Sequence, residues 1–494
     1  MLVGNLSEKS LIETLRDTGL LTEQCYIAGQ WRTAATGDVV DVYNPSDATL
    51  IGCVPDLSAA QATGAVDAAD TAFPAWAHAL PKERAQKLRQ WGASMLAECH
   101  DLALIMTLEQ GKPLQESLGE IDYAASFLDW YAGEAERLNV EGITPHLEGC
   151  DMRVSRVPVG VSALITPWNF PSAMITRKAG AALAVGCTVV VKPAPETPFS
   201  ALALAVLAER AGIPAGVFNV ITGDAPLLAK TLCDDLRVRA LSFTGSTRVG
   251  KQLLEWSAPT LKRVSLELGG HAPFIVFDDV DIERAVTDAV AAKFQTSGQD
   301  CLAANRIYVH DAIYADFCQR FAAATSSLKV GDGLSHGTDI GPLMHQGAID
   351  KCSQHVDDAC AKGARILAGG GRHAQGRLFF EPTVLADVTP NMAISYEETF
   401  GPVAALSSFS SEDQVIDLAN ATEYGLAAYL YTRDGARATR LASRLEFGMV
   451  AVNRVKMTGA PIPFGGMKQS GLGREGSRHG IDAFSDIQYI CTAT

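Results

Sequence analysis

The sequence predicts an α/β protein in which parallel sheets are covered by helices. Residues 157–280 alternate short β-branched runs with amphipathic runs, which is typical of strands joined by crossover helices. A second stretch of the same kind follows over residues 271–455. The chain has 494 residues, which is too long for one hydrophobic core, so we expect two or three domains.

The first α/β stretch contains four predicted strands and three predicted helices. Each strand is short and apolar and is followed within a few residues by proline or glycine, as expected of a buried strand that ends in a turn. The strands are predicted at residues 159–165, 188–191, 217–221 and 241–243, and the helices at residues 172–185, at 199–211 and from 245–246 towards 256.

The flanking regions are predicted to be mixed in the same way. Residues 22–140 begin with short strands and continue as helices, and residues 453–476 are rich in glycine and proline. A long irregular loop in a compact domain is often functional. Elements predicted here include a helix at residues 82–99, strands at 274–277, 306–309 and 449–452, and helices at 282–293 and 314–328.

Composition narrows the class of protein. The formal net charge is −15, which repels phosphate backbones and anionic lipid, so we expect neither nucleic acid nor a membrane as partner. The longest apolar stretch, residues 179–191, is too short to span a bilayer. Residues 1–8 lack a basic region followed by an apolar run, so no secretory signal is expected.

The eleven cysteines are scattered, with no Cys-x-x-Cys pair. This pattern indicates neither a disulfide framework nor a zinc site, and we expect no bound metal. A reducing compartment is the simpler interpretation, so we expect a cytoplasmic protein.

Two segments match nucleotide-binding motifs without their context. Residues 471–476 fit G-x-G-x-x-G but follow a loop rather than a strand, which argues against the dinucleotide fingerprint. Residues 245–252 approach a P-loop and follow a strand, but Gln252 replaces the hydroxyl residue that binds magnesium. We therefore expect neither a fingerprint at the first segment nor a P-loop at the second.

The same strand-to-helix turn allows another interpretation. Residues 243–246 end a strand and begin a helix, so free backbone N–H groups there suit a pyrophosphate. The alternative is a plain glycine turn with Ser246 as the N-cap, which is the commoner use of such a serine.

Three further residues are candidates for chemistry. A thiol at Cys301 and a carboxylate at Glu267 are the groups needed to oxidise an aldehyde covalently: the thiolate attacks, a hydride leaves, and the carboxylate activates water. Asn169, between two prolines, can offer its amide to an oxyanion. The alternatives are a packing cysteine, an ion-paired glutamate and an asparagine that makes local backbone bonds.

Taken together, these segments resemble the aldehyde dehydrogenase superfamily. The matching pieces occur in family order across nearly the whole chain, at residues 167–171, 191–193, 243–246, 266–270, 298–301, 397–402 and 463–466. Residues 174–180 and 468–476 are similar to the succinate-semialdehyde dehydrogenase-like branch.

The resemblance implies an aldehyde dehydrogenase-like fold with three parts. These are a doubly wound parallel-sheet cofactor domain at residues 22–133 and 153–265, an α/β catalytic domain at 266–467, and a small β oligomerisation flap at 134–152 and 478–494. Edge pairing of the C-terminal tail with another subunit is expected, in a homo-dimer or homotetramer.

The resemblance also implies oxidation of an aldehyde to its acid through a cysteine thiohemiacetal and thioester, with NAD or NADP as cofactor. Cys301 would be the nucleophile, Glu267 the base, and Asn169 with the Cys301 N–H the oxyanion hole, while Lys178 and Glu475 would assist proton transfer. The remaining implied residues would bind cofactor (Ile165, Thr166, Pro167, Trp168, Lys192, Glu196, Gly223, Gly245, Ser246, Leu268, Glu398 and Phe400) or substrate (Phe170, Arg177, Gln295, Asp300, Thr458 and Phe464).

The sequence departs from the family pattern at several places, and the first two bear on specificity. Pro195 stands where a glutamate often binds the adenosine ribose, which weakens repulsion of a 2′-phosphate, so NAD and NADP both stay open. Gln295 stands where the branch has arginine, and a lost charged hydrogen bond costs ~1.5–3 kcal/mol. Ala303 replaces a second cysteine, so no disulfide forms there.

A third departure also bears on specificity, because the loop serine of the branch aligns near Thr458 and Gly459, in a stretch at residues 457–462 that is largely apolar. We therefore predict a preference for uncharged aliphatic aldehydes of medium length, with succinate semialdehyde as the alternative. One rival interpretation is a non-oxidising or phosphorylating relative, against which Glu267 argues because it supplies a base for hydrolysis. The other is a catalytically silent structural protein on the same scaffold, against which the intact Asn169, Glu267 and Cys301 argue.

Overall fold

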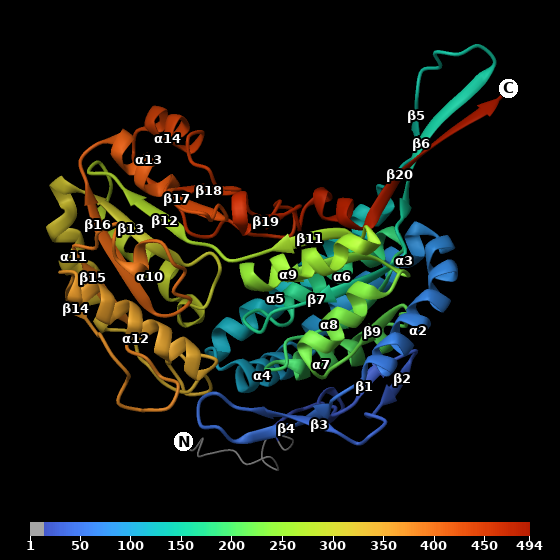
Figure 1. Ribbon diagram of the computed structural model, residues 1–494, viewed down its shortest axis with the longest axis horizontal. Helices are drawn as coiled ribbons and strands as arrows, with labels where there is room; N and C mark the ends of the chain where they lie inside the picture. Colours follow the sequence, from blue (N-terminus) through green and yellow to red (C-terminus); the bar gives the residue numbers. More distant parts are fainter. Residues whose placement is uncertain (1–13) are drawn as a thin grey trace.

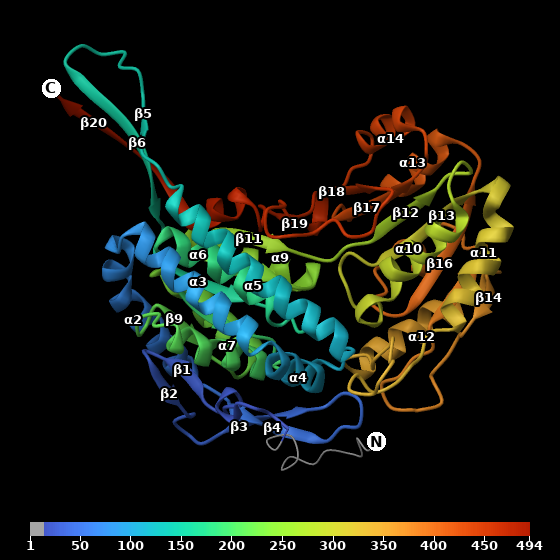
Figure 2. The same cartoon turned by 180° about the vertical axis from the view of Figure 1, so that it is seen from behind.

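The computed structural model describes residues 14–494. The expectation that no secretory signal is present concerns residues 1–8, which lie outside the described residues. Two α/β bodies lie side by side, and a thin β arm that carries the C-terminus projects from one of them (Figure 1). The view from behind shows helices α3, α5 and α7 packed together over one face of the first body (Figure 2).

The first body is built on an eight-stranded sheet with the order β19-β11-β10-β7-β8-β9-β1-β2. Its five central strands are parallel, and the edge strands β1, β2 and β19 run antiparallel to their neighbours. The strands are β1 (Cys25–Ile27), β2 (Gln30–Arg32), β7 (Val161–Ile165), β8 (Thr188–Lys192), β9 (Phe218–Val220), β10 (Val238–Thr244), β11 (Arg263–Glu267) and β19 (Gly471–Leu472).

Helices cover both faces of this sheet, so β7 and β8 are buried along their whole length. Strand β7 begins at Val161, two residues later than predicted, because Gly160 has a φ of 132°. The hairpin of β3 (Val39–Tyr43) and β4 (Leu50–Pro55) lies beside the sheet. The helices are α2 (Ala59–His78), α3 (Pro81–Ala97), α4 (Cys99–Gln110), α5 (Leu114–Glu136), α6 (Ala173–Val185), α7 (Pro198–Arg210), α8 (Ala225–Asp234) and α9 (Thr247–Ser257).

The second body contains a seven-stranded sheet with the order β14-β15-β16-β13-β12-β17-β18, parallel except for β14. Its core is a cluster of aromatic and aliphatic side chains between sheet and helices. The elements are β12 (Ala272–Val276), β13 (Ala304–His310), β14 (Arg365–Ala368), β15 (Thr383–Ala386), β16 (Val403–Phe409), β17 (Ala427–Tyr431), β18 (Met449–Val452), α10 (Ile282–Phe294), α11 (Asp311–Ser326), α12 (Gln346–Ala361), α13 (Glu412–Asn420) and α14 (Gly435–Ala442).

The predicted helices and strands are present, with small shifts at their ends. Helix α11 starts at Asp311 rather than at residue 314, because the ring of His310 accepts from the backbone N–H of Ala312 and caps the helix. Histidine is not among the usual capping residues, so this cap was not predicted. Short 3₁₀ turns lie at Thr18–Leu20, Ala258–Thr260, Gln295–Gly298, Ala393–Ser395, Lys468–Ser470 and Arg478–Phe484.

The arm is a three-stranded antiparallel sheet. It consists of β5 (Glu141–Gly142), β6 (Cys150–Pro158) and β20 (Ser485–Ala493), in the order β20-β6-β5. Strand β6 continues past the predicted flap boundary at residue 152, and Glu134 still belongs to α5. Strand β20 pairs with β6 of its own chain along its whole length, and its other edge has no strand beside it in the described chain.

Three chain-wide features bear on the sequence-based expectations. All eleven cysteines are free thiols. In residues 14–494, no group of three or more histidine, cysteine or acidic side chains is placed to hold a metal ion. No helix in that same part of the chain is long and apolar enough to cross a membrane.

The turn before β20 packs closely against α5, and this contact yields a stability prediction. A Cβ added at Gly480 would lie 1.9 Å from the hydroxyl oxygen of the buried Tyr131. We expect Gly480→Ala to destabilise the protein by roughly 1–3 kcal/mol, because a packed interior gives way only at the cost of strain.

Gly64→Ala is the matched control for this substitution. Gly64 lies inside α2, and an added Cβ there meets no atom within 4 Å. Replacing a helical glycine by alanine stabilises by about 0.5–1 kcal/mol. Thermal unfolding followed by circular dichroism should therefore give a lower midpoint for Gly480→Ala and an unchanged or higher midpoint for Gly64→Ala. Equal midpoints for the two variants would contradict the packing argument.

Candidate functional site

A cavity of about 780 Å³ lies at the carboxyl ends of β7, β10 and β11. In a parallel α/β sheet, this is the edge at which ligands bind. Segments from the second body close the cavity, including the loop that contains Cys301 and the loop that begins after β18. The cavity is therefore formed where the two bodies meet.

Most of the predicted site residues come together in this cavity. Its lining includes three predicted catalytic residues, seven predicted cofactor residues and all six predicted substrate residues: Cys301, Glu267, Asn169, Pro167, Trp168, Gly245, Ser246, Leu268, Glu398, Phe400, Phe170, Arg177, Gln295, Asp300, Thr458 and Phe464. Other predicted residues are not part of the lining, namely Lys178, Glu475, Ile165, Thr166, Lys192, Glu196 and Gly223.

Cys301 follows a segment with unusual backbone geometry. Thr296, Ser297 and Gly298 have φ values of 50°, 58° and 72°. Non-glycine residues in this left-handed region cost of order 1–3 kcal/mol each and persist only where the surroundings hold them. A Cβ at Gly298 would lie 2.3 Å from the carbonyl oxygen of Gly401. The turn before the thiol is thus fixed by close backbone packing.

Close contacts explain why both residues after Leu268, which follows β11, are glycines. A Cβ at Gly270 would lie 2.3 Å from the carbonyl oxygen of Cys301, and a Cβ at Gly269 would lie 2.7 Å from Oε2 of Glu398. Any larger side chain at these two positions would push away the cysteine loop or the glutamate. The pair therefore lets the end of β11 approach both groups.

The Cys301 thiol is in an environment that disfavours the thiolate. Burial, and then the nearby charge of Asp300, raise the pKa of this thiol well above its ordinary value, while Arg177 acts in the opposite direction. The thiol also interacts with the Asp300 side chain. Formation of the nucleophile therefore requires a proton acceptor or a nearby positive charge.

Glu267 ends β11 with its carboxylate in the same cavity. It is 2% exposed, and neither carboxylate oxygen has a hydrogen-bond partner in the described chain. Burial, followed by repulsion from Glu475, raises its pKa well above the ordinary value. No salt bridge neutralises it in residues 14–494. An unpartnered carboxylate with a raised pKa suits a general base.

A buried ion cluster lies next to Glu267. Oε2 of Glu475 accepts from Nε of Arg177 at 2.7 Å, and Oε1 accepts from Lys178 and, at 3.0 Å, from Ser242. Although burial opposes it, attraction by Lys178 and Arg177 lowers the pKa of Glu475 below its ordinary value. Two carboxylates in one buried region thus differ, since Glu475 is paired and Glu267 is not.

Asn169 connects the turn after β7 to the cysteine loop. Its side-chain Nδ2 donates to the carbonyl oxygen of Gln299 at 2.9 Å, and its own carbonyl oxygen accepts from Nζ of Lys112 at 2.5 Å. The side-chain bond joins residues 130 positions apart, so it is not the local bond considered from the sequence. The side-chain amide of Asn169 is therefore bound to the backbone of a residue that lies two positions before Cys301.

The start of α9 combines both sequence interpretations. Oγ of Ser246 accepts from the N–H of Val249 at 3.3 Å, which makes Ser246 the N-cap. Gly245 and Ser246 also line the cavity. The first N–H groups of a helix lack partners within the helix, so this end of α9 fits a pyrophosphate.

Glu398 and two aromatic rings line the cavity near the glycine pair. Oε1 of Glu398 accepts from the N–H of Gly270 at 3.0 Å, and burial raises its pKa to about 7. The rings of Trp168 and Phe400 meet edge to face with centroids 5.6 Å apart. A carboxylate with one oxygen still available fits sugar hydroxyls.

The predicted adenosine end lies beyond the cavity, around the ends of β8 and β9. Lys192 is 4% exposed, and its ammonium has no hydrogen bond or ion pair in the described chain. Burial lowers its pKa to about 8, opposed by Glu196. The N–H of Thr166 donates to the carbonyl oxygen of Lys192 at 3.2 Å. A buried, unpartnered ammonium fits a hydroxylated or anionic ligand.

The sequence alone did not point to the part of the lining supplied by α5. Glu116, Gly119 and Tyr123 lie on one face of this helix and line the cavity. Their spacing of three and four residues was visible as a helical face, but nothing in the sequence indicated that this face borders a cavity. Lys112, Met174 and Lys456 also line the cavity, and they too were not predicted as site residues.

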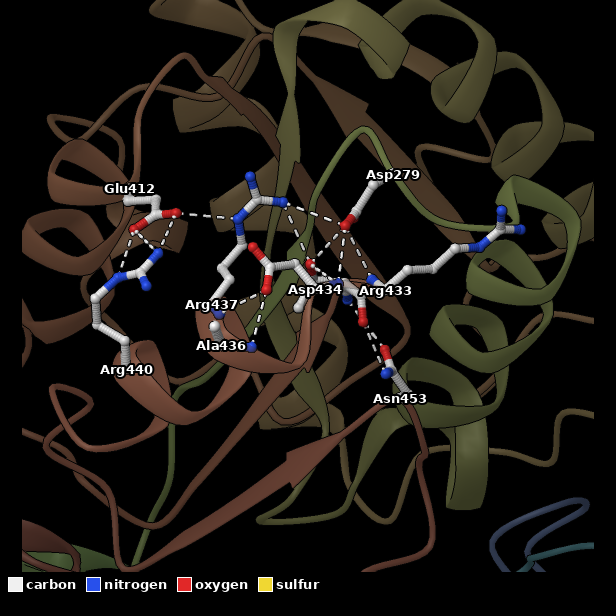
Figure 3. A network of polar contacts seen from close by, with 9 residues as sticks. Asp279, Glu412, Arg433, Asp434, Ala436, Arg437, Arg440 and Asn453 are labelled. Atoms are coloured by element: carbon white, nitrogen blue, oxygen red, sulfur yellow. Dashed lines mark hydrogen bonds and ion pairs between the residues drawn. The ribbon is translucent and has the colours of Figure 1, made fainter.

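A polar network fixes the start of the loop after β18 (Figure 3). Oδ2 of Asp279 accepts from Thr432 Oγ1 at 2.8 Å and from the N–H of Arg433 at 3.0 Å. The side chain of Asn453 exchanges two hydrogen bonds with the backbone of Thr432, at 2.8 and 3.0 Å, as the dashed lines show. This loop then supplies Thr458 to the cavity.

Comparison with known proteins assigns the chain to a family. The family model described as "Aldehyde dehydrogenase family" matches residues 31–490 of this chain. The aspartate-semialdehyde dehydrogenase (non-phosphorylating) of Halomonas elongata is 54% identical over 482 residues, covering 98% of each chain. The succinate-semialdehyde dehydrogenase [NADP(+)] of Escherichia coli is 52% identical over 477 residues, covering 97% of this chain and 99% of the relative.

Solved structures agree with the fold. The crystal structure of an E. coli NADP-dependent enzyme superimposes with a TM-score of 0.96 at 51% identity, covering 97% of this chain and 100% of the other. The crystal structure of the betaine aldehyde dehydrogenase of Staphylococcus aureus in complex with NAD⁺ superimposes with a TM-score of 0.95 at 33% identity. The match covers 99% of this chain and 97% of the other. The α/β fold class is confirmed.

The predicted function is confirmed at the level of an NAD(P)-dependent aldehyde dehydrogenase. Of the two substrate predictions, the relatives support the semialdehyde alternative better than the uncharged medium-chain aldehyde. The resemblance inferred from the sequence motifs is likewise confirmed. The chain belongs to the aldehyde dehydrogenase family.

Proposed function

We propose that this enzyme oxidises an aldehyde that carries a distal acid group, with Cys301 as nucleophile, Glu267 as base and Asn169 as oxyanion donor. One observation carries the proposal: a thiol, an unpartnered buried carboxylate and a fixed side-chain amide line the same cavity. This is the set of groups that acyl chemistry through a thioester requires.

In the proposed reaction, the Cys301 thiolate attacks the aldehyde carbon. The carbonyl oxygen becomes an oxyanion that accepts from Nδ2 of Asn169 and from the N–H of Cys301. Loss of hydride turns this adduct into a thioester, and the nicotinamide ring supplies the hydride acceptor when NAD or NADP is bound. Glu267 then takes a proton from water, which attacks the thioester and releases the acid and the Cys301 thiolate.

Proton balance gives the buried ion cluster a role. Glu267 has to lose the proton that it takes from water before the next turnover. Lys178, Glu475 and Arg177 form a continuous chain of polar contacts beside it, and Lys178 also donates to Thr244 of the cavity lining at 2.6 Å. We propose that Lys178 and Glu475 assist transfer of this proton away from the cavity, while Arg177 holds Glu475 in place.

The cofactor residues follow from the same geometry. Ser246 and the start of α9 would hold the pyrophosphate, Glu398 a ribose, and Lys192 the other ribose, with Phe400 and Trp168 beside the nicotinamide end. Domain roles follow too: residues 22–133 and 153–265 would bind the cofactor, and residues 266–467 would carry the nucleophile.

The acid group of the substrate would lie at Arg177. Its guanidinium group stacks over the ring of Phe464 at 4.0 Å, and the hydroxyl of Tyr123 contacts both Arg177 and Thr458. All four residues line the cavity. Lys456 is an exposed cation of the same lining, which suits attraction of an anionic substrate.

We also propose a homo-oligomer, dimer or tetramer, that forms through the arm. The edge of β20 that faces away from β6 is open, and this strand exposes Ile487, Tyr489 and Ile490. An open strand edge with apolar side chains favours pairing with another chain. The eleven free thiols support a cytoplasmic location.

Glu267→Gln tests the base. We expect rapid release of one equivalent of reduced cofactor and then very slow turnover, because the thioester forms but is not hydrolysed. Stopped-flow absorbance at 340 nm would measure the burst. Cys301→Ala should give neither phase while still binding cofactor, and the exposed Glu446→Gln should behave like the wild type. Normal steady-state turnover of Glu267→Gln would overturn the assignment.

The pH dependence of hydrolysis follows from the same residue. Burial raises the pKa of Glu267, and a base acts only in its deprotonated form. Hydrolysis of the thioester should therefore fall as the pH decreases through this raised pKa, at a pH above the ordinary glutamate range. A hydrolysis rate that stays constant down to the ordinary glutamate range would argue against Glu267 as the base.

Substrate choice is tested with two aldehydes of equal length. We expect kcat/KM for succinate semialdehyde to exceed that for butanal at least tenfold, because only the former offers an anion to Arg177. Tyr123→Phe should reduce this ratio several-fold, since the hydroxyl that contacts Arg177 and Thr458 is lost. A wild-type ratio of one or less would restore the uncharged-aldehyde hypothesis.

Cofactor choice is tested at Pro195, an exposed residue three positions after Lys192. Pro195→Glu should lower the ratio of kcat/KM for NADP to that for NAD by roughly five- to tenfold, because a carboxylate there repels a 2′-phosphate. Pro195→Gln is the uncharged control and should leave the ratio nearly unchanged. Equal effects of both substitutions would show that charge is not the cause.

A further inference from the structure

We infer that the aldehyde taken by this site carries an ammonium group as well as an acid group, and that Asp300 and Glu116 receive the ammonium. The substrate class is then an α-amino acid whose side chain ends in an aldehyde. This inference rests on the proposed function, since it assumes that Cys301 attacks the aldehyde and that Arg177 faces the acid group.

Two carboxylates line the cavity with no cation bound to them. Oε2 of Glu116 accepts from the N–H and the hydroxyl of Thr296, at 2.9 and 3.1 Å, and Oδ1 of Asp300 accepts from the N–H of Leu302 at 3.0 Å. Neither carboxylate takes part in a salt bridge in residues 14–494. Oε1 of Glu116 has no hydrogen bond in the same residues.

The nearby cations are already engaged. Nζ of Lys112 binds Oε2 of Glu120 at 2.7 Å and the carbonyl oxygen of Asn169 at 2.5 Å. Arg177 binds Glu475 through Nε and contacts the sulfur of Met174 through Nη2 at 3.0 Å. Lys112 and Arg177 therefore offset the negative charges of Asp300 and Glu116 only in part, and the pKa of both carboxyl groups stays above its ordinary value.

These charges work against the chemistry of a purely anionic aldehyde. Asp300 is the largest electrostatic cause that raises the pKa of Cys301, and burial raises the pKa of Glu116 to about 7. Both carboxylates would also repel a substrate carboxylate in the same cavity. In a site for a simple semialdehyde, neither negative charge would assist binding of the acid group.

An ammonium group on the substrate removes this conflict. Bound between the two carboxylates, it neutralises Asp300 and takes over the interaction that Asp300 makes with the thiol. The thiolate then forms more readily, because the negative charge next to it is paired. Each polar end of the molecule has its own partner: the aldehyde meets Cys301, the acid group meets Arg177, and the ammonium meets Asp300 and Glu116.

The decisive comparison uses L-aspartate 4-semialdehyde and succinate semialdehyde, which differ only in the ammonium group. For the wild type we expect kcat/KM to be at least tenfold higher for the amino compound. Asp300→Asn and Glu116→Gln should each reduce that ratio severalfold or more, because each variant lacks one of the two carboxylates that face the ammonium. Equal losses for both aldehydes in both variants would overturn the inference.

A binding measurement avoids the chemical step and requires no variant. L-Homoserine and 4-hydroxybutyrate carry an alcohol in place of the aldehyde, and they differ in the same ammonium group. As competitive inhibitors of the wild type against succinate semialdehyde, L-homoserine should bind at least tenfold more tightly. Equal inhibition constants would overturn the ammonium site even if a variant failed to fold.

Failure of the inference and failure of the proposed function give different results. If succinate semialdehyde is a good substrate and the amino compound is not preferred, the ammonium site is wrong and the proposed function stands. If neither semialdehyde is oxidised faster than butanal, the proposed acid-group specificity is wrong as well. Glu446 does not line the cavity, so the Glu446→Gln variant is the control for effects of removing a surface charge.

Discussion

The close approach of two backbones at the end of β11 is the constraint on which the site depends. Gly270 faces the carbonyl oxygen of Cys301, and Gly269 faces the carboxylate of Glu398, at distances that leave no room for a side chain. Because the strand belongs to one α/β body and the cysteine loop to the other, this contact joins the two bodies. The relative positions of Cys301 and Glu267 in the cavity depend on this contact.

The second determinant is that two buried carboxylates differ in whether they have ionic and hydrogen-bond partners. Glu475 is neutralised by two cations and a hydroxyl, whereas Glu267, a short distance along the same interior, has none. An unpaired buried carboxylate destabilises a fold, so its presence at the cavity is a cost of function. The paired cluster beside it also fixes Arg177, which therefore presents one defined side to the cavity.

Charged side chains in the cavity form two groups of opposite sign. Arg177 with Tyr123 and Thr458 forms one polar group, and Asp300 with Glu116 forms another of opposite sign. The first group favours an acid end, and the second disfavours it unless a positive charge accompanies it. Gln295, exposed within the lining, adds no charge to either group.

The sequence by itself determined the fold class, most strands and helices, and the three residues proposed for the chemistry. Strand and helix periodicity is a local property, and the motifs around Asn169, Glu267 and Cys301 are short and contiguous. The tertiary structure alone decided which side chains share a cavity. Glu116 belongs to an ordinary helical face, and the role proposed for it depends on the contact of that face with a loop 180 residues away. Long-range packing and the resulting desolvation set the charges of the site, and no local pattern encodes them.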